Sequence, residues 1–132
     1  MSSELHMLVF TSVLGLVQLL ASAQAATAQR GVKWNIGNRE EKSAPLSGMA
    51  GRLNRAFANL METFPFFAVA VLLVHVTHKN TAGTAIGAQL YFYARVLYFP
   101  VYAAGLKVVR SLLWMTGLLG LCLLLWPLLK LA

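Results

Sequence analysis

The stretch GRLNRAFANLMETFPFFAVAVLLVHV, residues 51–76, places polar side chains at the start of one of the most apolar segments of the chain. Drawn as an α-helix, it has one polar stripe within an arc of about 80°, formed by Arg52, Arg55, Asn59 and Glu62. A polar side chain inside a bilayer is costly unless it is paired, faces other protein or meets a ligand. The stretch therefore predicts a membrane helix whose polar stripe has a partner.

The composition indicates that this helix belongs to an integral membrane protein. Of the 132 residues, 58% are hydrophobic and 11% are charged, whereas soluble domains carry about 25% charged residues. Apolar segments long enough to cross a hydrocarbon core of about 30 Å lie at about 5–28, 51–76, 81–106 and 111–129. Backbone groups in lipid must be hydrogen-bonded within their own segment, so all four are predicted to be helices. We expect one domain, residues 1–132, folded as an all-α four-helix membrane bundle.

The loops predict an orientation. Residues 29–50 and the turn after the third segment carry most of the Lys and Arg outside the spans, while the short second loop carries only Lys79. The positive-inside rule then places the first and third loops in the cytoplasm and both termini on the other side. The N-terminal segment resembles a signal peptide, but Glu4 and the lack of Lys or Arg before it favour a retained first span. Ser47 is expected to cap the second span.

A second polar stripe lies in the third segment. Within an arc of about 60° fall Tyr91, Arg95, Tyr98 and Tyr102. If the second and third spans are antiparallel, Glu62 and Arg95 both lie roughly 16 Å from the cytoplasmic helix ends. The same calculation places Asn59 at the depth of Tyr98, and Arg55 at the depth of Tyr102. We expect the stripes to face each other, within a subunit or across an interface, with Glu62 neutralising Arg95.

Two interpretations of the stripes are open. They are either polar contacts that hold helices together, worth about 0.6–2 kcal/mol each, or part of a ligand site. The second is favoured because a basic cluster without acidic partners lies at the cytoplasmic mouth, formed by Arg52, Arg55, Lys107 and Arg110. Such a cluster beside a tyrosine-lined cleft suits a small anion. In a membrane protein, the net charge of +7 is interpreted as a determinant of membrane topology and of anion binding, not as a sign of nucleic-acid binding.

No metal site is expected. His75 and His78 are three residues apart, but no further Asp, Glu or Cys lies close in the sequence, so polar anchors at the membrane interface are the favoured interpretation. Trp114 is interpreted in the same way, as a membrane-interface or packing residue.

Two motifs resemble those of one known family. RLNRAFANLMETFP, residues 52–65, is similar to the Arg-x-x-Arg-Ala-x-x-Asn-x-x-Glu-x-x-Pro core of MAPEG proteins, the membrane-associated proteins of eicosanoid and glutathione metabolism. ARVLYFPVYAAGLKVVRS, residues 94–111, resembles the family's second block. One departure is Thr63, where the leukotriene-synthase-like branch has Tyr. The likeness extends over nearly the whole chain.

The resemblance implies a homotrimer that binds glutathione in clefts between subunits, open to the cytoplasm. The glutathione-binding residues that it implies, together with the neighbouring polar stripe, are Arg30, Arg52, Arg55, Asn59, Glu62, Arg95, Tyr98 and Tyr102. Arg110 would stabilise the glutathione thiolate, with the Tyr102 hydroxyl as a hydrogen-bond donor. Guanidinium groups suit the two carboxylates of glutathione, and a nearby cation raises the thiolate fraction of a thiol.

The expected function is therefore a membrane-bound glutathione transferase or peroxidase that acts on a lipophilic electrophile or hydroperoxide arriving from the bilayer. The absence of mitochondrial or chloroplast targeting features favours the inner membrane of a bacterium, with periplasmic termini. The alternative is a non-catalytic scaffold of the same fold that binds lipid or a partner, because a fold does not by itself establish an enzyme.

Overall fold

The structure is a computed structural model that describes residues 1–37 and 45–130. Within these ranges the regular secondary structure is helical: α1 Ser3–Arg30, α2 Val32–Ile36, α3 Gly48–Val76, α4 Ala82–Ala103 and α5 Lys107–Leu129. The expected all-α bundle is confirmed. The loop residues Arg39 to Lys42 lie outside the described residues.

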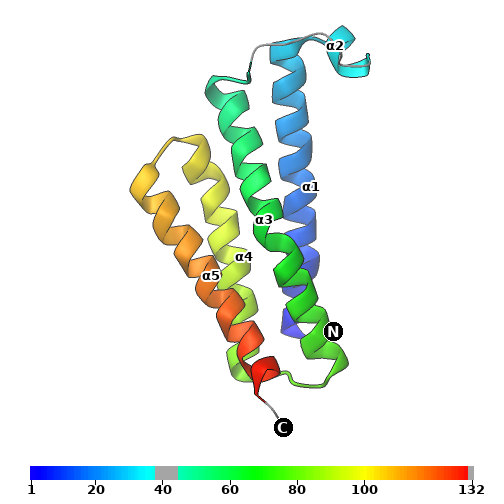
Figure 1. Ribbon diagram of the computed structural model, residues 1–132, viewed down its shortest axis with the longest axis vertical. Coiled ribbons are helices and arrows are strands. Elements are labelled where there is room, and N and C mark those ends of the chain that lie inside the picture. The colour runs from blue at the N-terminus through cyan, green and yellow to red at the C-terminus, as the bar shows by residue number, and fades with distance from the viewer. Residues whose placement is uncertain (38–44, 131–132) are drawn as a thin grey trace.

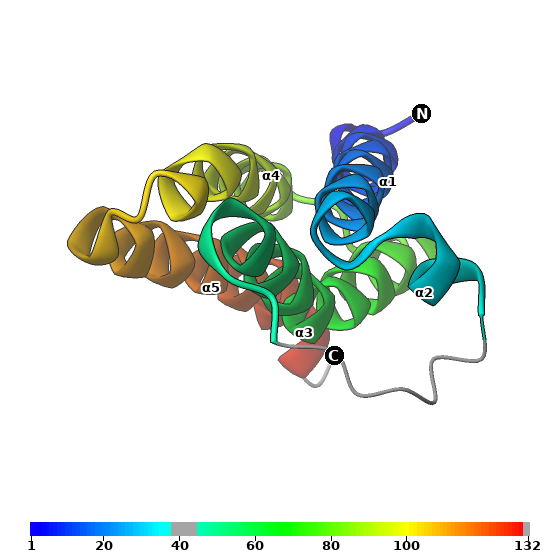
Figure 2. The ribbon, with the colours of Figure 1, turned by 90° about the horizontal axis from the view of Figure 1, so that it is seen from above.

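The four long helices run up, down, up and down (Figure 1). The start of α1, the end of α5 and the α3–α4 turn lie at one end of the bundle, and the end of α1, the start of α3 and the α4–α5 turn lie at the other (Figure 1). In the view along the bundle, α3 lies among the other long helices (Figure 2), and it packs against all three of them. The helix α3 therefore has neighbouring helices on more than one side.

Three helices, α1, α3 and α5, are long and apolar enough to cross a membrane. The fourth, α4, has 22 residues and packs along α5 more extensively than any other pair of helices. Gln89, Arg95 and several tyrosines lower the hydropathy of α4, which explains why it differs from the other three. The helix that carries the second polar stripe thus lacks the long apolar stretch that the other three contain.

Helix ends differ slightly from those that hydropathy predicts. α4 ends at Ala103 and α5 begins at Lys107, because Gly105 adopts a left-handed conformation with φ 80° and turns the chain tightly. The short helix α2 was not predicted. It follows Gly31, which has φ 98° and ends α1.

Side-chain hydrogen bonds fix the two ends of α1. Near the start, the buried Glu4 carboxylate accepts hydrogen bonds from the Asn80 amide and, at 2.9 Å, from the Thr84 hydroxyl at the beginning of α4. Near the end, Gln29 donates to the Ser47 hydroxyl at 3.1 Å and accepts from the Ser47 backbone N–H at 3.0 Å. Ser47 is the N-cap residue of α3, as expected, but its hydroxyl makes no capping bond to the helix.

Small residues allow the backbones of α4 and α5 to touch. A Cβ added at Gly120 would lie 2.5 Å from the Gly87 carbonyl oxygen, and one added at Gly87 would lie 2.7 Å from the Gly120 oxygen. The core beside this crossing contains Phe67 stacked on Tyr91 with ring centroids 4.2 Å apart. This close crossing fixes α5 against the tyrosine-bearing helix.

Candidate functional site

A cleft of about 490 Å³ opens beside α4 and α5, toward the end of the bundle that holds their connecting turn. α3 contributes Asn59, α4 contributes two tyrosines, and α5 contributes the rest of the wall; the lining residues are Asn59, Tyr98, Tyr102, Arg110, Ser111, Trp114 and Met115. The volume lies in the range of small-molecule sites, roughly 300–1,000 Å³.

The α4 wall is aromatic and faces a guanidinium. Tyr98 and Tyr102 are one helical turn apart, so their rings lie on the same face with centroids 5.6 Å apart. The tight turn at Gly105 brings the first turn of α5 back beside them, and the Arg110 guanidinium carbon lies 4.7 Å from the centre of the Tyr102 ring. A cation over an aromatic face is held in place by the ring's negative potential.

The polar stripe of α3 bonds to the stripe of α4. Arg55 Nε donates to the Tyr102 hydroxyl at 3.1 Å, a pair that their equal depths predict. One turn nearer the helix end, Arg52 Nε donates to the Ala103 carbonyl at 2.8 Å. The phenolic oxygen of Tyr102 accepts the Arg55 hydrogen bond, which leaves the Tyr102 O–H hydrogen free to be donated into the cleft.

The pairing of Arg95 differs from the expectation. Its Nη1 donates to the Asn59 side-chain oxygen at 2.8 Å, and its Nε and Nη2 have no hydrogen-bond partner among the described residues. Glu62 is exposed on α3 and attracts Arg95 electrostatically without a hydrogen bond. The expected neutralisation of Arg95 by Glu62 is therefore an electrostatic attraction within one chain and not a hydrogen bond. Asn59 bonds to Arg95 and not to Tyr98, because equal depth does not fix which side chain reaches which.

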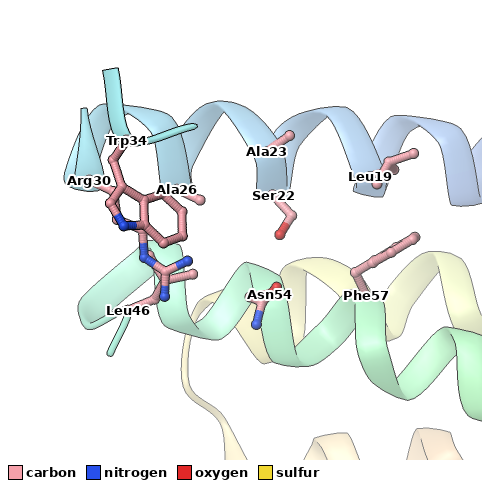
Figure 3. Close-up of a pocket in the computed structure, with 9 residues that line it drawn as sticks. All are labelled: Leu19, Ser22, Ala23, Ala26, Arg30, Trp34, Leu46, Asn54 and Phe57. Atoms are coloured by element: carbon pink, nitrogen blue, oxygen red, sulfur yellow. The ribbon is translucent and has the colours of Figure 1, made fainter. Parts of the chain in front are cut away.

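Arg30 lies in a different cavity. A groove of about 360 Å³ between the ends of α1 and α3 is lined by Leu19, Ser22, Ala23, Ala26, Arg30, Trp34, Leu46, Asn54 and Phe57. Figure 3 shows Arg30 and Trp34 at its end, with the Ser22 hydroxyl directed toward α3. The Arg30 guanidinium carbon lies 4.7 Å from the Trp34 ring centre.

The two cavities lie on different sides of α3. They share no lining residue, and Asn54 and Asn59 point from α3 in directions about 140° apart. Within one chain the structure therefore brings together Arg52, Arg55, Asn59, Tyr98, Tyr102 and Arg110 but leaves Arg30 apart from them.

Sequence reasoning missed three residues of the cleft: Ser111, Trp114 and Met115. Trp114 follows Arg110 by four residues on α5, so helical spacing alone could have placed it on the same face. It was interpreted instead as a membrane-interface or packing residue. Thr63, the departure from the family motif, donates to or accepts from the Tyr91 hydroxyl at 2.7 Å below the cleft.

His75 lies at the far end of α3 from the cleft. Across the part of the chain that the structure describes, no three His, Cys, Asp or Glu side chains come together as a metal site would require. The donors in the cleft are guanidinium, phenol, amide and hydroxyl groups, which suit an anion with hydrogen-bond acceptors better than a cation.

The fold and the cleft together define an integral membrane protein, an apolar helical bundle with an open basic and aromatic cleft near one end. The family model of the MAPEG family matches residues 7–130. The chain therefore belongs to the MAPEG family, which confirms the resemblance seen in the two motifs. No curated protein matches the chain. Family membership supports a membrane role of the glutathione-related transferase or peroxidase kind, or a related one.

Proposed function

We propose that the protein is a glutathione-dependent transferase or peroxidase that activates the glutathione thiol in the cleft beside α4 and α5. The observation that carries the proposal is the position of Arg110, whose guanidinium lies over Tyr102 and lines the open cleft. A free thiol has a pKa of about 8.5, and an adjacent cation favours the nucleophilic thiolate. Arg110 supplies the cation, and the free Tyr102 hydroxyl donates a hydrogen bond to the sulfur.

Polar residues in the cleft and beside it suit the rest of the tripeptide. Arg52 and Arg55 lie at the mouth, where guanidinium groups bind carboxylates. Asn59 offers an amide to the peptide backbone, and the exposed Glu62 suits the ammonium group of glutathione. Trp114 and Met115, exposed on α5, give a lipophilic electrophile or hydroperoxide an apolar surface beside the sulfur.

We further propose a homotrimer with glutathione between neighbouring subunits. Arg30 is directed into a groove on the other side of α3, so it reaches a ligand in the Arg110 cleft only from a neighbouring chain. Glu62 is exposed at a depth where lipid contact would be costly, which favours coverage by a second subunit or by ligand.

The proposed location is the inner membrane of a bacterium, with the α1–α3 and α4–α5 connections in the cytoplasm and both termini in the periplasm. Most cations lie at that end of the bundle, namely Arg30, Lys33, Arg52, Arg55, Lys107 and Arg110. The positive-inside rule then orients the chain. Labelling of single cysteines introduced near Lys107 and near the N-terminus, in intact and in opened cells, tests this orientation.

Ultraviolet difference absorbance of the glutathione thiolate tests the proposed chemistry. Glutathione added to the purified protein should give a thiolate band that Arg110→Ala abolishes. Lys107→Ala is the matched control, since Lys107 is an exposed cation in the same helical turn and does not line the cleft. A wild-type protein without the band, or a band that survives Arg110→Ala, would contradict the proposal; the absence of the band from the wild type would favour the non-catalytic scaffold.

A further inference from the structure

Arg95 is enclosed behind the wall of the cleft. Only 2% of its surface is exposed, and it is not among the residues that line the cleft. A ligand in the cleft therefore meets Arg95 only through the side chains in front of it.

Two of those side chains are in direct contact with Arg95. Its Nη1 donates to the Asn59 oxygen at 2.8 Å, and its guanidinium carbon lies 4.1 Å from the centre of the Tyr98 ring. Both residues line the cleft. The guanidinium thus links α3 and α4 at the point where each supplies part of the wall.

Fold stability alone does not account for a guanidinium in this position. Nε and Nη2 have no acceptor among residues 1–37 and 45–130, and none of the Arg95 nitrogens donates to a carboxylate. A buried charge without a hydrogen-bonded counter-ion costs free energy, and replacing such a group by an apolar side chain of similar volume is often neutral or stabilising. The charge itself is the feature that an apolar residue could not supply.

We propose that Arg95 is a positioning residue, which holds Asn59 and Tyr98 against the cleft and places a positive charge behind Tyr98 that favours an anionic ligand in front of it. The inference rests on the proposed glutathione function. In the low dielectric of a buried site, the attraction between charges extends farther than in water. Arg95 therefore adds to the field of Arg110 from the opposite wall without touching the thiol.

The test compares Arg95→Met, which removes the charge, with Arg95→Lys, which keeps it. Tyr91→Phe is the matched control, because it deletes another α3–α4 hydrogen bond, between the Thr63 and Tyr91 hydroxyls, and Tyr91 does not line the cleft. Each variant is measured for glutathione affinity by calorimetry, thiolate absorbance, melting temperature, and near-ultraviolet circular dichroism without glutathione.

Arg95→Met is expected to weaken glutathione binding and to lower the thiolate fraction by about threefold, less than the roughly tenfold effect of a charge within about 4–6 Å, because Tyr98 lies between Arg95 and the ligand. Its melting temperature should equal or exceed that of the wild type, and its near-ultraviolet spectrum should change because Tyr98 loses its support. Arg95→Lys should recover most of the thiolate. Tyr91→Phe should melt earlier and keep the thiolate.

Wild-type affinity and thiolate in Arg95→Met would overturn the inference. Losses of affinity and thiolate that only accompany a lower melting temperature would also overturn it, because a purely structural role predicts that result. A wild-type protein that forms no thiolate would instead count against the proposed function. In that event the near-ultraviolet spectrum still decides on Arg95, since an unchanged spectrum in Arg95→Met would overturn its positioning role.

Discussion

The close crossing of α4 and α5 gives a quantitative prediction for Gly120→Ala. The added Cβ would lie 2.5 Å from the Gly87 carbonyl oxygen and 2.9 Å from the Tyr91 backbone nitrogen. Ordinary contacts are about 3.5 Å, so the two helices must separate by about 1 Å at this point. Both atoms belong to backbone and cannot move aside alone. Overpacking of this kind costs about 1–3 kcal/mol, which corresponds to a fall of about 4–12 °C in melting temperature.

Gly117→Ala is the matched control on the same helix. Its Cβ would meet only side-chain carbons, Tyr91 Cδ2 at 3.7 Å and the Ala94 Cβ at 3.8 Å, which is ordinary contact. Alanine is also the better helix former by about 1 kcal/mol. We therefore expect Gly117→Ala to melt at or above the wild-type temperature, measured by thermal unfolding of both proteins in the same detergent. Equal melting temperatures for the two variants would refute the argument that backbone contact fixes α5 against α4.

Three further predictions concern polar contacts. Tyr102→Phe removes the acceptor of the Arg55 hydrogen bond and the proposed donor to the thiolate, so turnover of a general electrophile should fall about tenfold, a loss of about 1.4 kcal/mol; unchanged turnover would exclude this donor. Glu4→Ala deletes the acceptor of two hydrogen bonds at the start of α4. It should lower the melting temperature, at a cost of about 1–3 kcal/mol, and leave the thiolate band intact. Loss of the band would show that the cleft depends on hydrogen bonds at the opposite end of the bundle. If the proposed trimer forms, Glu62→Gln should reduce its fraction in light scattering more than Glu40→Gln does, and equal effects would remove Glu62 from the proposed interface.

The helices and their polar faces could be predicted from the sequence because hydropathy and helical period act locally. Arg55, Asn59, Tyr98 and Tyr102 fall on stripes that a 100° rotation per residue places correctly, and the structure brings these stripes together. In an up-and-down bundle, helices that follow one another in the sequence pack side by side, so the sequence also indicates which helices are neighbours. The family motifs cover the same helices, which explains why the sequence indicated the family as well as the fold.

Contacts between the stripes were less predictable because they depend on side-chain reach. Asn59 and not Glu62 bonds to Arg95, since helix rise gives depth but not the rotamer that meets the guanidinium. The cavity that Arg30 enters also depends on the orientation of α1 about its own axis relative to α3, which helical periodicity does not fix. Trp114 differs from these contacts, because its spacing of four residues from Arg110 on α5 is local and already indicates the shared face.

The decisive measurement is a crystal structure of the protein with glutathione bound. We expect density for glutathione in the cleft beside α4 and α5, with its sulfur within hydrogen-bond distance of Arg110 and Tyr102 and a carboxylate near Arg55. Glutathione density remote from Arg110, or an Arg110 side chain turned away from Tyr102 into solvent, would contradict this prediction.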